Sequence, residues 1–174
     1  MVSIPELKKW RGRAGDVFAI EVGPRMFAFG QICATKDFAF FDIKSEGALP
    51  IETVLRAPVL FRVPMARGGT TGRPWFFLGN AKPEGVLAEF ATYRVQPVGS
   101  NQIFLIKSGL ADEAQVEVPA EKAEQFEPMA WWFCEHIEER LRDWYFNRPS
   151  SIVAAMHRIR RYDASGQEIR FAAV

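Results

Sequence analysis

The stretch that decides the fold runs from residue 14 to residue 43 and reads AGDVFAIEVGPRMFAFGQICATKDFAFFDI. It contains three short runs rich in Phe, Ile and Val, at 17–22, 26–34 and 38–43, separated by the turn-type clusters GPR and TKD. Aromatic and β-branched residues bounded by turn residues favour strands. The stretch therefore predicts three consecutive antiparallel strands in an up-and-down meander.

The alternation within these runs indicates how the sheet is built. Phe18 and Ile20 alternate with Val17 and Ala19, so one face of the first strand is plainly apolar. Gly30 lies inside the second run, and a glycine within a strand is typical of a bulge or a sharp bend. We therefore expect a strongly bent antiparallel β-sheet or a small SH3-like barrel.

Further strands are expected after the meander. A short helix or turn is predicted at 50–57, where the sequence leads to Pro58. Apolar runs bounded by Gly, Pro and Asn predict the later strands at 59–63, 75–78, 90–95, 102–106 and 115–118.

The hydrophobic period then changes from strand-like to helical. Phe133, Ile137, Leu141 and Trp144 are separated by four, four and three residues, the spacing of an apolar stripe on a helix. The stripe predicts a helix over 128–146.

The last part of the chain favours an α+β fold. A second helix is expected over 152–160 and a last strand over 168–174. Because strands come first and helices afterwards, we expect a single α+β domain over 1–174, mainly β in 1–110 and mainly helical in 111–174, with the C-terminal helices packed on the sheet.

Length and composition favour an ordinary globular domain. The chain has 174 residues, of which 48% are hydrophobic and 25% charged. The N-terminus has no run of signal-peptide length, and no stretch approaches the roughly 20 apolar residues that a membrane span needs. Two cysteines, Cys33 and Cys134, do not form a disulfide framework. We therefore expect a cytoplasmic protein without a membrane span.

The charge is unevenly distributed although the net charge is only +1. Residues 111–139 carry nine acidic side chains against Lys122 alone, whereas the segments on either side are net positive. A block of one sign produces a local field that can steer a basic partner. The alternative interpretation is that these acidic residues only form the solvated face of a helix and of the loop that precedes it.

The acidic block also contains the adjacent residues Trp131 and Trp132. On one helix they cannot both face the same core, so one of them is expected to be exposed, unless both lie beneath the loop 108–127. An exposed tryptophan beside carboxylates is the composition of a protein-binding hot spot, and an exposed pair is also compatible with a homodimer. The residues expected to bind a protein partner are Glu124, Glu127, Trp131, Glu135, Glu138 and Glu139.

No catalytic or metal-binding residues are predicted. His136 and Glu139 form an H-x-x-E pair, but a catalytic zinc needs three protein ligands and no second cluster is visible. Cys134 and His136 point about 200° apart on a helix and cannot share a proton. We expect no cofactor.

Two weaker binding hypotheses concern anions and nucleic acids. The loop ARGGTTGRP, residues 66–74, places Arg67 and Arg73 beside three glycines whose backbone N–H groups would cradle a phosphate. It lacks the P-loop pattern, and a strand rather than a helix follows it. Nucleic-acid binding is disfavoured because the pI is only about 7.8 and the Phe residues lie in strand patterns that place them in the core.

The N-terminal half resembles a known family. The segments that carry the resemblance are GDVFAI (15–20), FAFGQIC (27–33), FAFFDI (38–43), PVLFRVP (58–64) and W-x-x-x-G-N (75–80). Their order, and their spacing around Gly15, Asp16, Gly30, Trp75 and Gly79, resemble the immunity protein 26 family of bacterial polymorphic toxin systems over about residues 8–90.

The resemblance implies a non-enzymatic inhibitor that binds a cognate toxin in the cytosol. Such toxins are often nucleases with basic active faces, so an acidic surface would bind them by charge complementarity. The resemblance does not cover the Gly-rich insert 66–74 or the section 91–174. Two alternatives stay open: an SH3-like RNA-binding or plasmid-maintenance ribonuclease-like protein, and a small-ligand or anion-binding accessory domain.

Overall fold

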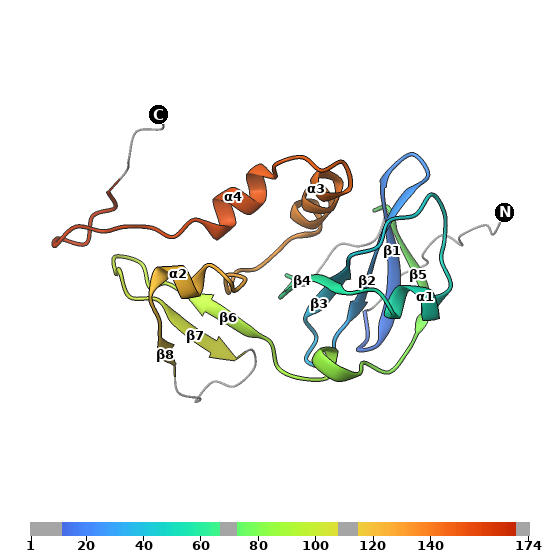
Figure 1. The fold of residues 1–174 in the computed structure, drawn as a ribbon, viewed down its shortest axis with the longest axis horizontal. Coiled ribbons are helices and arrows are strands. Elements are labelled where there is room, and N and C mark those ends of the chain that lie inside the picture. Colours follow the sequence, from blue (N-terminus) through green and yellow to red (C-terminus); the bar gives the residue numbers. More distant parts are fainter. Residues whose placement is uncertain (1–11, 67–72, 108–114, 170–174) are drawn as a thin grey trace.

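The computed structural model describes residues 12–66, 73–107 and 115–169. The strands lie in the first two thirds of the chain, and the two longest helices lie in the last third (Figure 1). The strands are β1 (Asp16–Gly23), β2 (Met26–Ile32), β3 (Phe38–Phe41), β4 (Val59–Val63), β5 (Trp75–Asn80), β6 (Thr92–Val95), β7 (Phe104–Lys107) and β8 (Val116–Glu117). The helices are α1 (Ile51–Leu55), the 3₁₀ turn η1 (Gly85–Leu87), α2 (Ala120–Ala123), α3 (Cys134–Tyr145) and α4 (Ser151–His157).

The strands form two antiparallel sheets. The first has five strands in the order β4-β3-β2-β1-β5, and the second has three in the order β6-β7-β8. The predicted α+β class, the antiparallel meander and the C-terminal helices are therefore confirmed. The barrel alternative is wrong, because β5 pairs with β1 and leaves β4 and β5 as the two edges of an open sheet.

Both faces of the five-stranded sheet are covered. Phe18 and Ile20 lie on the face that packs against Ile137 of α3. Val17 and Ala19 lie on the opposite face, in a second apolar cluster that includes Val54 of α1 and the partly buried flanking loops. The alternation thus separates two buried faces rather than a buried and a solvated one, as is usual where helices cover both sides of a sheet.

Gly30 has a different role from the predicted bulge. It pairs regularly with Phe18 on one side and Phe40 on the other, without a shift of register at that point. A Cβ atom at Gly30 would lie 2.5 Å from Cζ of Phe18 and 2.7 Å from the carbonyl oxygen of Ala39. The bulge prediction is wrong: the glycine makes room for an aromatic ring that crosses over it, and the register shifts occur elsewhere, including between Glu21 and Gly23.

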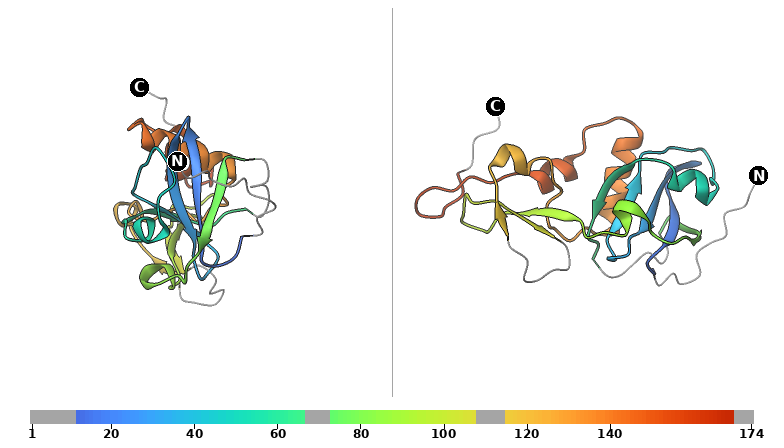
Figure 2. Two further views of the ribbon diagram at one scale, coloured as in Figure 1. Left: turned by 90° about the vertical axis from the view of Figure 1, so that its right-hand side faces the viewer. Right: turned by 60° about the horizontal axis from the view of Figure 1, so that its bottom comes forward.

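The two sheets lie toward opposite ends of the long axis, with α4 in the region between them (Figures 1 and 2). The connection from α2 to α3 joins them: Pro128 forms a parallel β-bridge with Arg94 of β6, and Trp132 forms one with Met65 after β4. We call residues 127–133 the bridging segment. The predicted helix over 128–146 therefore begins only at Cys134, because the backbone of the bridging segment bonds to both sheets instead of to its own next turn.

The C-terminal section follows the second sheet. Helix α4 begins one residue before its predicted start and ends three residues before its predicted end. Side-chain amides then hold the extended chain: Gln96 bonds to both backbone groups of Arg160, and Asn101 to both of Tyr162. Of the predicted last strand, Glu168 bridges to Tyr162, and residues 170–174 lie outside the described part of the chain.

No helix within the described residues is long and apolar enough to cross a membrane.

The contact over Gly30 generates a stability prediction. Replacing Gly30 with Ala forces the ring of Phe18 and the neighbouring strand apart, so we expect the free energy of unfolding to fall by about 2 kcal/mol or more. Denaturation by urea measures the loss. Gly47→Ala is the matched control, since a Cβ atom there meets nothing within 4 Å. Equal stability of the two variants would show that the sheet does not depend on this close contact.

Candidate functional site

The bridging segment presents a row of exposed apolar side chains. Met129, Trp131 and Phe133 are 39%, 66% and 52% exposed, whereas Trp132 between them is fully buried. We call these three exposed residues the apolar row. The expectation that one tryptophan of the pair is exposed is confirmed, and the alternative that both are covered is wrong.

Hydrogen bonds to both sheets hold this segment in place. The N–H of Met129 donates to the carbonyl oxygen of Arg94 over 2.8 Å, and the N–H of Trp132 donates to that of Pro64 over 3.1 Å. Trp132 fills the core below, where the guanidinium of Arg140 lies 5.0 Å from its ring centroid. The apolar row is thus fixed on ordered backbone, which lowers the entropic cost of using it for binding.

Glu138, which lies one helical turn after Cys134, is committed to the fold. Its carboxylate accepts hydrogen bonds from Nη1 of Arg73 at 3.1 Å and from Nε1 of the buried Trp75 at 2.8 Å. The Glu138 side chain is only 13% exposed. It therefore anchors α3 to the start of β5, and a partner could not contact it without breaking this anchor.

Arg73 is occupied by two carboxylates. It binds Glu138 and also Glu135, whose own side chain is 62% exposed. Burial by itself would lower the pKa of the Arg73 guanidinium, but the hydrogen bond and charge of Glu138 and the charge of Glu135 raise it above its ordinary value. An anion at Arg73 would have to displace both carboxylates, and Arg67 lies outside the described residues. The predicted anion site thus gains no support.

Glu127 is the centre of a second ion-pair cluster. Arg140 donates to both of its carboxylate oxygens, over 2.6 and 3.0 Å, and Nε2 of His157 lies 2.8 Å from Oε2. Burial by itself would raise the pKa of the Glu127 carboxyl, but the hydrogen bonds from His157 and Arg140 outweigh it and lower the pKa. Glu127 is thus a structural residue that ties the bridging segment to α3 and α4.

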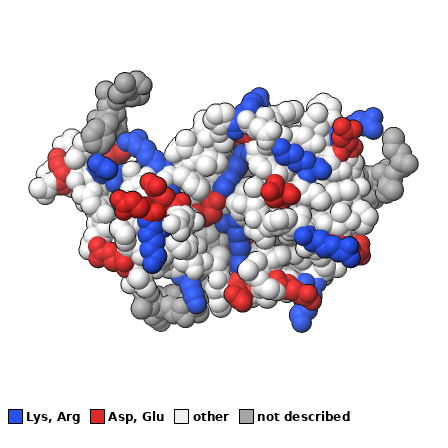
Figure 3. All heavy atoms as spheres, in the orientation of Figure 1, with Lys and Arg blue, Asp and Glu red and all other residues white. Residues whose placement is uncertain are grey.

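The remaining predicted acids stay at the surface in two groups. Glu139 is exposed on α3 and accepts a 3.1 Å hydrogen bond from the hydroxyl of Ser151. Glu124 is exposed at the end of α2, beside Glu121. Figure 3 shows acidic side chains gathered over α2, while elsewhere on this face acidic and basic side chains are mixed. The structure therefore divides the acidic block into a part near α2 and a part at the start of α3.

Sequence reasoning missed Met129 and Phe133. The signal was present in the stretch PMAWWFC, in which large apolar residues recur at every second position. Because Phe133 also fits the helical stripe of Ile137 and Leu141, the sequence predicts a helix that includes residues 128–133, whereas α3 begins only at Cys134.

The cysteines and histidines do not form a reactive site. Burial raises the pKa of the thiols of Cys33 and Cys134 to about 11, so both are protonated at neutral pH and are weak nucleophiles. Both thiols are free. No group of three or more His, Cys, Asp or Glu side chains that would hold a metal occurs in residues 12–66, 73–107 and 115–169.

Comparisons of the chain with known protein families, with curated proteins and with solved structures found no match.

The Glu127 cluster predicts a pH-dependent stability. Replacing Glu127 with Gln leaves Arg140 and His157 without their carboxylate, and we expect the free energy of unfolding at pH 7 to fall by about 3 kcal/mol. Because the folded-state pKa is depressed, the stability from Glu127 is present above its ordinary pKa of 4.5 and is lost as the pH falls through the folded value. The difference between the original chain and Glu127→Gln should therefore shrink as the pH falls from about 4.5 through the folded value.

Chemical denaturation over a pH series measures this difference. Glu121→Gln, at an exposed position of α2, is the control and should change the stability by only a few tenths of a kcal/mol. A constant difference at all pH values would mean that the Glu127 charge does not stabilise the fold.

Proposed function

We propose that this chain is a non-enzymatic immunity protein that binds a cognate bacterial toxin in the cytoplasm and neutralises it. The proposal joins the family resemblance of the N-terminal half to one observation from the structure. That observation is the apolar row, three large exposed side chains on a segment that both sheets hold in place.

The chemistry of the row fits a protein partner. Tryptophan and other large apolar side chains dominate the energetics of protein interfaces when a polar rim surrounds them. Trp131 is exposed by 66%, and the exposed carboxylates of Glu135 and Glu139 follow it on the first turns of α3. A basic surface on the toxin would pair with these carboxylates and place an apolar pocket over Trp131.

The exposed carboxylates of Glu135 and Glu139 act mainly on the rate of association with the toxin. Exposed charges steer association and are screened by salt, so each contributes little to the final affinity. Glu127 and Glu138 do not belong to this contact because their side chains are only 17% and 13% exposed and bind arginines inside the fold. Glu135 also pairs with Arg73, but 62% of its side chain stays exposed. The binding residues proposed here are therefore Trp131, Met129, Phe133, Glu135 and Glu139.

The RNA-binding alternative has less support. Stacking on RNA bases requires exposed aromatic faces beside basic side chains. Phe18, Phe29 and Phe40 of the meander are fully buried beneath the elements that cover the two faces of the sheet. The sheet therefore offers no stacking platform within its described strands.

The test begins by identifying the toxin. The tagged chain captures its partner from a lysate of the source cells, and the purified partner is then assayed with and without the purified chain. We expect the chain to inhibit the partner's toxic activity, and Trp131→Ala to weaken the binding by about thirtyfold, the effect of losing a hot-spot residue. Glu139→Lys should slow association and reduce its dependence on salt.

Val98→Ala is the control variant for Trp131→Ala. Val98 is 88% exposed in the loop between β6 and β7. The Val98→Ala variant should therefore bind the toxin with the same affinity as the original chain. If Trp131→Ala bound the toxin with full affinity, the apolar row would not be part of the contact. A captured partner whose activity the chain does not inhibit would count against the immunity function itself.

A further inference from the structure

Helix α4 packs beside β4 and α3 without burying a side chain completely. None of its seven residues, all of which the structure describes, is buried. Ile152, Val153 and Met156 are only partly buried where they pack against the apolar cluster that contains Phe18 and Ile137. Because tertiary packing supplies most of the stability of a helix in a protein, α4 gains comparatively little from its position.

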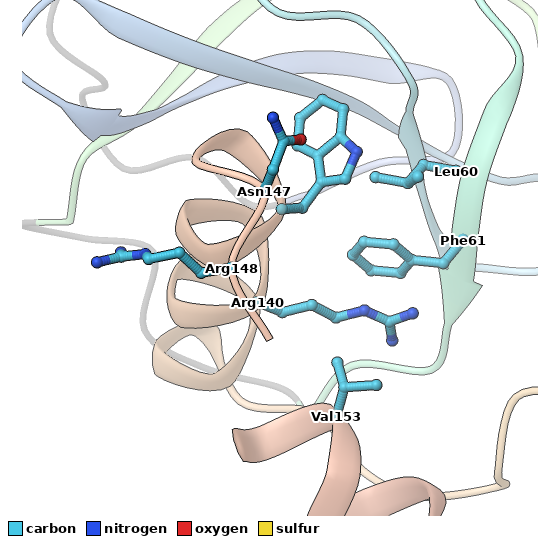
Figure 4. Close-up of a pocket in the computed structure, with 7 residues that line it drawn as sticks. Leu60, Phe61, Arg140, Asn147, Arg148 and Val153 are labelled. Carbon is cyan, nitrogen blue, oxygen red and sulfur yellow. The ribbon is translucent and has the colours of Figure 1, made fainter. Parts of the chain in front are cut away.

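A hollow separates α4 from part of the surface that it covers. The hollow has a volume of about 310 Å³ and lies between β4, the second half of α3 and α4 (Figure 4). Leu60 and Phe61 project from β4 toward it, Trp144 lines it from α3, and Val153 approaches it from α4. Atoms that line a hollow lack neighbours on one side and lose dispersion contacts. The packing beneath α4 is therefore incomplete.

The helix also has little stability of its own. Its seven residues make about two turns, and isolated helices of this length do not form in water. Ser150 occupies the N-cap position, but its hydroxyl makes no cap bond and has no hydrogen-bond partner among the described residues. The first N–H groups of α4 thus lack the side-chain acceptor that commonly stabilises a helix start.

Both ends of α4 continue into chain that is attached elsewhere. Before α4, Nζ of Lys44 donates hydrogen bonds to the carbonyl oxygens of Trp144 and Tyr145 at the end of α3. After α4, the side-chain amide of Gln96 bonds to both backbone groups of Arg160. These attachments do not involve α4 itself, so the helix can unfold or swing outward while they stay in place.

Polar contacts at its two ends hold α4 closed. Nε2 of His157 lies 2.8 Å from Oε2 of Glu127, and the carbonyl oxygen of His157 accepts a hydrogen bond from Arg94. At the other end, the hydroxyl of Ser151 donates to Glu139 over 3.1 Å. Hydrogen bonds to an ionised group are stronger than those between neutral groups. The contact between His157 and Glu127 is therefore well suited to hold the helix.

We propose that α4 is a lid that opens as a unit while α3 and both sheets stay folded, and that the contact between His157 and Glu127 is its latch. The open state uncovers the apolar surface formed by Leu60, Phe61 and Trp144. Glu127 is also the first residue of the bridging segment, so the lid and the support of the apolar row share one carboxylate. No residue of α4 belongs to the apolar row, and the lid does not depend on the proposed toxin contact.

Amide hydrogen exchange of the full chain, followed by NMR, tests the lid. Local opening lets the amides of α4 exchange while the sheets stay folded. We expect protection factors in α4 to be at least about a hundredfold lower than those in β1 and β2. Low concentrations of urea should reduce the protection of β1 and β2 steeply and that of α4 only slightly, because opening α4 exposes little surface.

Variants separate opening of the lid from unfolding of the whole chain. Gly30→Ala destabilises the first sheet and should lower the protection of β1 and β2 by about thirtyfold, while the protection of α4 stays unchanged. His157→Ala breaks the latch and should lower the protection of α4 by about tenfold. His136→Ala, the same change on α3, is the matched control and should leave the protection of α4 unchanged.

Two results would overturn the lid. One is protection in α4 as strong as that in β1 and β2. The other is protection in α4 that falls with urea, or on Gly30→Ala, as steeply as the protection of the first sheet. The urea series uses the unaltered chain and tests the lid independently of how well Gly30→Ala folds. Equal protection of α4 in His157→Ala and in the original chain would overturn the latch.

Discussion

The arrangement of the two sheets depends on one largely buried carboxylate, that of Glu127. Removing a carboxylate from water is costly unless its oxygens are well bonded. Here Arg140 of α3 and His157 of α4 both bind it, and Arg140 in turn lies against Phe61 of β4. The carboxylate thus specifies which helix surfaces meet and how the bridging segment approaches the first sheet. Because that segment is held at both ends, it does not continue the helix of α3 backwards, and the apolar row stays exposed.

The acidic block of the sequence consequently has two uses. Glu127 and Glu138 face inward and stabilise the packing of α3 and α4, whereas Glu124 and Glu139 face solvent. Charge counted along the sequence therefore overstates the field available to a partner, because ion pairs with Arg73 and Arg140 cancel part of it. The surface that remains is apolar at its centre and acidic at its edge, which is the usual anatomy of a protein interface.

The residues that carry the family resemblance all support the first sheet. A Cβ atom at Gly15 would meet the carbonyl oxygen of Ala81 at 2.6 Å, and one at Gly79 would meet Ile51 at the same distance. Asp16 accepts a hydrogen bond from Asn80, and Trp75 donates one to Glu138. These positions are required for the structure of the sheet and do not by themselves indicate a binding function. The function proposed for this chain must therefore be tested on the bridging segment and α3, which lie outside the resemblance.

The sequence by itself determined the local elements: the meander of β1 to β3, the β6–β7 hairpin and the stripe of Ile137 and Leu141. Periodicity reports these because neighbouring residues alone decide which side of a strand or helix a side chain takes. Only the tertiary structure decided that the sheet stays open, that Gly30 lies under Phe18, and that Arg73 and Glu127 are neutralised within the fold. Each of these depends on partners distant in sequence, whose pairing leaves no local pattern. The start of α3 at Cys134 was decided in the same way, because bonds to Arg94 and Pro64 outweighed the helical period.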